Sequence, residues 1–179
     1  MRVLAIAGSI PGKSAPIGNE RPIARTSDLM NTSADKKPRR AARARSQARK
    51  FAMQALYQWQ MTSYEPNDLV KQFVEGEEFG GADREYFEEL LRGSIAQREQ
   101  IFAGIEPFID RPLDQLDPVE TAILMIGMYE LRSRLDVPYR VVINEAVDLA
   151  KRFGATDAHK YVNAVLDRAA KELRAHERL

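Results

Sequence analysis

Cysteine is absent from this chain of 179 residues, and histidine occurs only twice, as His159 and His176. The absence of cysteine excludes disulfide bonds, cysteine-ligated zinc and thiol nucleophiles. Neither histidine has a second ligand at metal-binding spacing. We therefore expect no metal or other cofactor, and the lack of cysteine fits a reducing cytoplasm.

Long apolar runs are also missing. The longest, Ala122 to Tyr129, is typical of a buried helix and is far shorter than the roughly 20 residues that span a bilayer. Near the N-terminus, the apolar stretch from Val3 to Ala7 is too short for the core of a secretory signal. We expect a cytoplasmic protein without a membrane partner.

Strand patterns are absent as well, whereas helical spacing of apolar residues begins at Ala41 and continues toward the C-terminus. Asp117-Pro118-Val119-Glu120 is typical of a helix start, with Asp at the N-cap, Pro in the first turn and Glu placed to return the cap. Asp83, and either Thr156 or Asp157, are expected to begin two further helices. The sequence therefore predicts an all-α fold of about seven helices in two small bundles, residues 39–105 and 106–179. The expected buried stripes include Ala52, Ala55, Leu56 and Trp59 in one helix and Val142, Ala146, Leu149, Ala150 and Phe153 in another.

Residues 1–38 have a different composition. Four prolines lie here among Gly, Ser, Thr and Asn, without sustained helical spacing, so we expect a disordered N-terminal extension. Met30 offers an alternative natural start, in which case residues 1–29 would be an over-long start assignment.

A loose phosphate-loop pattern lies in this extension, from Ala7 to Ser14. In a working phosphate loop the Lys meets phosphate and the loop opens a helix. Here Pro16 and Gly18 follow at once, and no apolar strand ending in Asp is present to hold a metal. We therefore expect no nucleotide site and no enzymatic activity.

Basic residues are concentrated in one stretch. Between Lys36 and Lys50, eight of fifteen residues are Lys or Arg and none is acidic, whereas from Phe51 onward 15 basic residues stand against 23 acidic ones. This distribution predicts a polyanionic partner at one place. On a helix Arg45 and Arg49 share a face, and guanidinium groups bind phosphate and stack on bases. We predict RNA binding, with a solubilising helix end and DNA binding as the alternatives.

Four segments, taken in order and spacing, resemble the NusB family of bacterial transcription antitermination factors over about residues 40–175. One segment alone would be a weak signal, whereas four in order are a strong one. The segments are ARKFAMQALYQWQ (48–60); DPVE (117–120) leading to MYEL (128–131); DVPY (136–139) with INEAVDLAK (143–151); and FG (153–154) with HKYVNAVLD (159–167).

This resemblance implies two three-helix subdomains, no catalysis and a heterodimer with the small-subunit ribosomal protein NusE. The pair would bind the boxA element of ribosomal RNA leader transcripts, with other antitermination factors and RNA polymerase as indirect partners. Many relatives have arginines where this chain has Ser46-Gln47, so RNA contacts are expected to shift upstream. The implied RNA-binding residues are Arg39, Arg40, Arg43, Arg45, Arg49, Phe108, Lys160 and Tyr161, and the implied partner-binding residues are Glu120 and Asp157.

Two alternatives stay open at this point. Glu120 is also explained as the returning residue of a capping box. Alternatively, the whole chain could be a protein-interaction module that forms a homodimer and so covers its RNA-binding face until a partner arrives.

Overall fold

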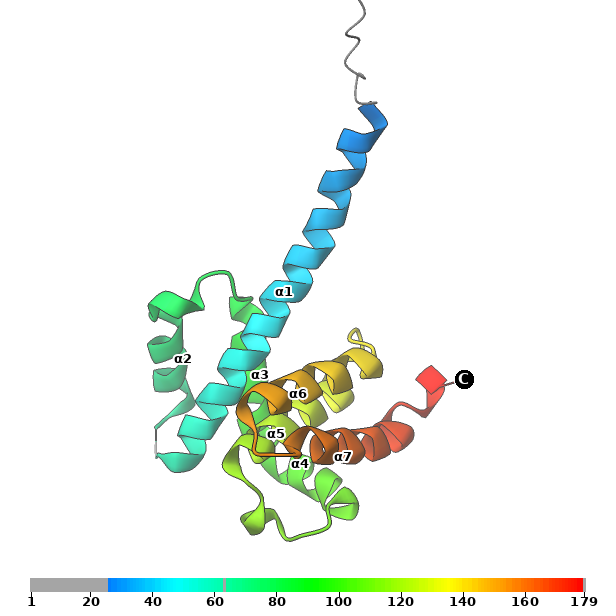
Figure 1. Ribbon diagram of the computed structural model, residues 1–179. Coiled ribbons are helices and arrows are strands. Elements are labelled where there is room, and N and C mark those ends of the chain that lie inside the picture. The colour runs from blue at the N-terminus through cyan, green and yellow to red at the C-terminus, as the bar shows by residue number, and fades with distance from the viewer. Residues whose placement is uncertain (1–25, 63, 179) are drawn as a thin grey trace, which may run out of the picture.

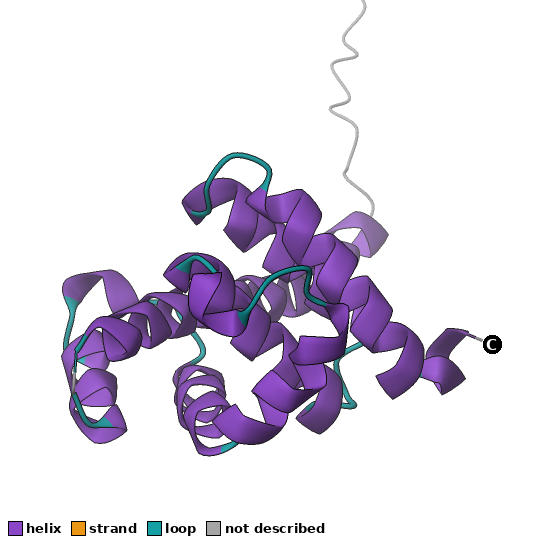
Figure 2. Ribbon diagram, turned by 90° about the horizontal axis from the view of Figure 1, so that it is seen from below, coloured by secondary structure: helices purple, strands orange, loops and turns teal. Residues whose placement is uncertain are grey.

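The computed structural model in Figure 1 describes residues 26–62 and 64–178. Every regular element in these two ranges is helical, which confirms the predicted all-α fold with seven α-helices (Figure 2). Nowhere in the same two ranges is a helix both long and apolar enough to cross a membrane. The α-helices are α1 (Thr26–Met61), α2 (Pro66–Val74), α3 (Arg84–Ala96), α4 (Arg98–Ile105), α5 (Pro118–Ser133), α6 (Tyr139–Phe153) and α7 (Ala158–Leu173), and the short 3-10 turns are η1 (Glu77–Phe79), η2 (Glu106–Phe108), η3 (Leu113–Gln115) and η4 (Ala175–Arg178).

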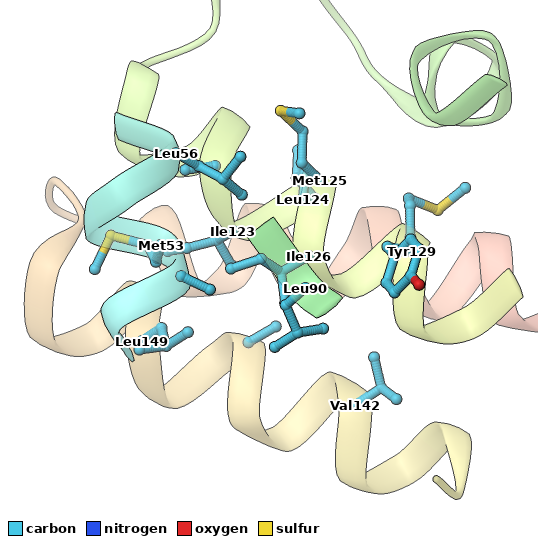
Figure 3. Close-up of a cluster of buried hydrophobic side chains, with 14 of the residues drawn as sticks. Met53, Leu56, Leu90, Ile123, Leu124, Met125, Ile126, Tyr129, Val142 and Leu149 are labelled. Carbon is cyan, nitrogen blue, oxygen red and sulfur yellow. The ribbon is translucent and has the colours of Figure 1, made fainter. Parts of the chain in front are cut away.

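Helix α5 forms the centre of the molecule. It packs against α1, α3, α4, α6 and α7, and its residues 120–131 are all buried. Because neighbours surround it, the helix is apolar on nearly every side, as the run from Ala122 to Tyr129 predicted. Figure 3 shows α1 side chains Met53 and Leu56, α3 side chain Leu90 and α6 side chain Leu149 gathered around it.

The helices form two groups, and α5, a member of the second, also packs against α1 and α3 of the first. Helices α1, α2 and α3 pack together, as do α5, α6 and α7. Helix α4 packs mainly against α5, with smaller contacts to α3 and α7. A division at residue 105, as proposed from the sequence, would therefore separate α4 from its main packing partner.

Helix starts follow local capping chemistry. The Asp117 carboxylate accepts hydrogen bonds from the amides of Val119 (2.8 Å) and Glu120 (3.3 Å), and Asp83 accepts one from the amide of Tyr86 (3.1 Å). Both predicted caps are confirmed. Asp157 occupies the N-cap position of α7, but its φ of 67° is left-handed and its side chain makes no capping bond.

Helix α1 begins earlier than the sequence predicted. It starts at Thr26 and passes through Pro38, so the expected disorder up to residue 38 does not hold for residues 26–38. A proline inside a helix removes one backbone hydrogen bond, but the Ala, Arg and Lys residues after it are strong helix formers. The N-terminal part of α1 extends away from the other helices (Figure 1). Residues 1–25, including the phosphate-loop pattern, lie outside the described residues.

One predicted core residue lies at the surface. In α6, Val142, Ala146, Leu149 and Ala150 are buried as expected, whereas Phe153 is 37% exposed. Phe153 is the last residue of the helix, so the apolar stripe runs past the edge of the core.

Candidate nucleic-acid interface

The basic run on α1 divides between two faces of the helix. At about 100° per residue, Arg40 and Arg43 lie within about 40° of Lys36, whereas Arg45 lies about 180° away. Lys36, Arg39, Arg40 and Arg43 are all exposed, and we refer to these four residues as the basic ridge. Among the side chains that the structure describes, no acid lies within ion-pairing distance of the ridge. The ridge is therefore available to a polyanion.

Arg49 lies on the inward face, so it is not placed for the RNA contact that the sequence predicted. Only 3% of its side chain is exposed. Its guanidinium forms an ion pair with Glu130 (2.7 Å), a longer one with Glu145 (3.5 Å) and a hydrogen bond to the Tyr86 hydroxyl (3.0 Å). Burial lowers the pKa of Arg49, but the hydrogen bond and charge of Glu130 outweigh this effect and raise it overall. Arg49 is thus a charged structural residue that joins α1 to α5 and α6.

Arg45 lies at the solvent-exposed edge of the polar cluster that Arg49 forms with Tyr86 and Glu130. Its guanidinium stacks over Tyr86 at 5.0 Å from the ring centroid and is close to Asp83 (3.9 Å) and Asp136 (3.5 Å). The guanidinium of Arg134 lies over the same ring at 4.8 Å. Burial and the charge of Glu130 raise the pKa of the Tyr86 hydroxyl, so it stays protonated beside the carboxylate. Arg45 is 39% exposed, so it can meet a ligand only at the edge of this cluster.

Asp136 makes the stability of the folded protein depend on pH in the acidic range. The hydrogen bond from Arg134 lowers the pKa of Asp136 to about 2. Because the folded pKa is depressed, this stabilisation is present above the ordinary carboxyl pKa of about 4 and is lost as the pH falls toward 2. We expect Asp136→Asn to lack this part of the acid dependence, a change within about 1 kcal/mol because the side chain is half-exposed. Urea unfolding at pH 5 and at pH 2.5 measures it, with Asp148→Asn as a control that keeps the wild-type dependence. Equal acid sensitivity in the Asp136 variant and the wild type would contradict this assignment.

The remaining predicted residues gather elsewhere, at the start of α5. The segment from η2 to Arg111 lies along α7: Arg168 donates to the carbonyl oxygen of Phe108 (3.3 Å), and the Arg111 guanidinium lies 5.0 Å from the ring centroid of Tyr161. We refer to Phe108, Arg111, Glu120, Lys160 and Tyr161 as the Tyr161 cluster. Arg111 was not predicted, because it lies in a proline-flanked connection without helical spacing and only the contact with Tyr161 identifies it.

Within the Tyr161 cluster, exposure differs strongly from residue to residue. The Tyr161 hydroxyl is buried and Glu120 is only 9% exposed, whereas Lys160 is well exposed. Lys160 forms an ion pair of 2.9 Å with Asp157, an exposed residue beside the cluster. Burial and the neighbouring Asp117 raise the pKa of Glu120, while Arg111 opposes the rise. A ligand would therefore meet Arg111, Lys160 and Asp157 first.

The basic ridge and the Tyr161 cluster are separated by more than the length of α5, because the ridge lies on α1 before Arg49, the residue that meets the end of α5. Helices α1 and α5 are antiparallel, because Arg49 pairs with Glu130 near the end of α5, whereas Gln60 donates to the carbonyl of Pro118 at its start. The 16 residues of α5 span about 24 Å. The structure thus does not join the predicted RNA-binding residues into one contiguous site.

Residues 46–171 of the chain match the NusB family. The transcription antitermination protein NusB of Marinomonas sp. (strain MWYL1) is 49% identical over 145 residues, which cover 80% of this chain and 83% of that protein. The corresponding protein of Alcanivorax borkumensis is 49% identical over 134 residues, covering 75% of this chain and 89% of its own length.

Solved structures agree with this assignment. A crystal structure of the antitermination factors NusB and NusE in complex with dsRNA matches with a TM-score of 0.63 and 30% identity, over 73% of this chain and 98% of that chain. T. maritima NusB matches with a TM-score of 0.63 and 30% identity, over 72% and 91%. On the strength of the matched residues, the identity to these relatives and the shared helical fold, the chain belongs to the NusB family.

Proposed function

We propose that this protein is a transcription antitermination factor that binds the boxA element of ribosomal RNA leader transcripts together with the ribosomal protein NusE. The observation that carries the proposal is the basic ridge, a set of exposed cations on an otherwise acidic protein of the NusB family. Such a ridge attracts RNA by releasing counterions from its phosphates. Membership in a family with a related structure of NusB, NusE and dsRNA supports NusE as the protein partner and RNA as the ligand.

The RNA-binding residues of this proposal are Arg39, Arg40, Arg43 and, at the edge of its cluster, Arg45. At the other end of α5, Phe108, Lys160 and Tyr161 supply aromatic and cationic groups suited to unpaired bases. Arg111 joins this set because it covers the Tyr161 ring.

The NusE contact is proposed at Asp157 and Glu120. Asp157 presents its carboxylate to solvent, with its side chain 60% exposed, and suits a direct contact. Glu120 is largely buried near Arg111, so we propose that it acts by orienting Arg111 at the edge of that surface.

Fluorescence anisotropy of a labelled boxA-containing RNA tests the function. The titrations use this protein with and without NusE, at about 50 and about 200 mM salt. We expect NusE to tighten binding, higher salt to weaken it, and a scrambled RNA to bind at least about tenfold more weakly. The same affinity for both RNAs, with and without NusE, would overturn the proposal and leave a helical protein-binding domain.

A further inference from the structure

The guanidinium of Arg45 is held in place while its N–H groups remain available to a ligand. It stacks on the ring of Tyr86, a side chain that is itself only 2% exposed, so a buried group fixes its position. Its nearest carboxylates, Asp136 (3.5 Å) and Asp83 (3.9 Å), lie at ion-pairing rather than hydrogen-bonding distance. Within the described part of the chain, Arg45 donates no side-chain hydrogen bond.

The Asp136 carboxylate does not satisfy Arg45, because both of its oxygens bond to another arginine. Arg134 donates to one oxygen from Nε (2.8 Å) and to the other from Nη2 (2.9 Å). Arginine forms the same paired contact with a phosphate group. Asp136 therefore offers Arg45 a negative charge without a two-oxygen contact, whereas a phosphodiester supplies both.

We infer that in the free protein the Asp136 carboxylate occupies the place of an RNA phosphate at Arg45. The carboxylate keeps the guanidinium positioned for RNA, and it also repels the phosphate that takes its place. Asp136 is thus a positioning residue that lowers the affinity for RNA. This inference rests on the RNA binding of the proposed function and adds an intramolecular competitor to it.

The charge of the surrounding cluster agrees with this role. Among the described side chains, five carboxylates lie within ion-pairing distance of the three guanidiniums at this place; the acids are Asp83, Glu89, Glu130, Asp136 and Glu145, and the arginines are Arg45, Arg49 and Arg134. A phosphate that approaches Arg45 therefore meets an excess of negative charge. Asp136 is the most exposed of the five acids, at 52%, and the nearest to Arg45, so its charge opposes the phosphate most strongly.

Fluorescence anisotropy with boxA-containing and scrambled RNA of equal length tests the competition. Asp136→Asn keeps the shape of the side chain and removes its charge. We expect this variant to bind both RNAs about threefold more tightly at about 50 mM salt and about twofold at about 200 mM, from the screened repulsion of a charge about 5 Å away. Asp148→Asn removes an exposed carboxylate elsewhere on α6 and is the matched control, with an expected change below about 1.5-fold.

Arg45→Met removes the cation for which the two anions compete. This variant should lose affinity for both RNAs, with the salt slope reduced by about 1. In the double variant Arg45→Met/Asp136→Asn, the loss of the carboxylate should give no gain beyond that of the Asp148→Asn control, because the competition requires Arg45. Both side chains are partly exposed, and circular dichroism confirms that each variant is folded.

The outcomes separate this inference from the proposed function. If wild-type protein binds RNA without preferring boxA, with or without NusE, the proposed function fails, and the variants still decide the competition on either RNA. If wild type binds neither RNA, both fail. If wild type prefers boxA RNA but Asp136→Asn binds no more tightly, or gains equally with and without Arg45, the inference is wrong and the proposed function stands.

Discussion

Arg49→Met is expected to lower the free energy of unfolding by about 3–5 kcal/mol. The substitution removes the cation and leaves the Glu130 carboxylate, which is 1% exposed, buried beside the protonated Tyr86 hydroxyl without its positive partner. Removing one member of a buried ion pair is costly because the other charge stays out of water. Urea unfolding followed by circular dichroism measures the loss.

The double variant Arg49→Met/Glu130→Leu distinguishes two contributions to the free energy of unfolding: the loss caused by one buried charge without a partner, and the stabilisation by the intact pair. Because both charges are gone, we expect it to recover much of the lost stability. Arg45→Met, at a partly exposed position on the same helix face, should cost less than about 1 kcal/mol. Equal destabilisation by Arg45→Met and Arg49→Met would show that Arg49 is not buried as described.

Arg174→Met is the second substitution with a large expected effect, also about 3–5 kcal/mol. Arg174 is fully buried although it lies at the end of α7. Its guanidinium donates to the carbonyl oxygens of Leu131 (2.7 Å), Glu130 (3.1 Å) and Arg134 (2.8 Å), and more weakly to that of Val137 (3.4 Å). The Glu130 and Leu131 carbonyls lie in the last turn of α5, where carbonyls run out of partners within the helix, and the other two lie in the segment that follows.

The same group also pairs with Glu177, so the substitution removes this ion pair together with the hydrogen bonds to the carbonyls. Arg174→Lys should fall between wild type and Arg174→Met, because an ammonium retains the charge but cannot reach several carbonyls in a planar fork. Lys171→Met, at an exposed position of the same helix, is the matched control and should change stability by no more than about 0.5 kcal/mol. A loss of that small size in Arg174→Met would contradict the capping role.

Much of the fold could be predicted from the sequence, because helix caps and stripes of apolar residues depend on residues that are close to one another in the chain. The Asp117 and Asp83 caps and the continuous apolar run of α5 all depend on neighbours within a few residues. The sequence predicted too late a start for α1, because the prolines near its start favour a loop although the residues between them favour a helix.

The site was harder to predict, and Arg49 shows the reason. Helical spacing correctly placed Arg45 and Arg49 on one face, but spacing does not say whether that face meets solvent or core. The partner that decides the matter, Glu130, lies 81 residues away in the sequence. Arg174 is similar, since its acceptors are backbone carbonyls about 40 residues away that carry no sequence signature.

Because α1 is continuous, only certain insertions and deletions within it keep the direction in which the basic ridge points. The basic ridge and the buried Arg49 lie on a single continuous helix. The number of residues between them therefore sets the direction in which the ridge points relative to the core. One residue inserted between Arg43 and Arg49 would turn the ridge by about 100°, away from its present exposed direction. Insertions and deletions in this stretch are therefore tolerable only in steps close to whole helical turns, whereas residues before Lys36 are free of that phase requirement.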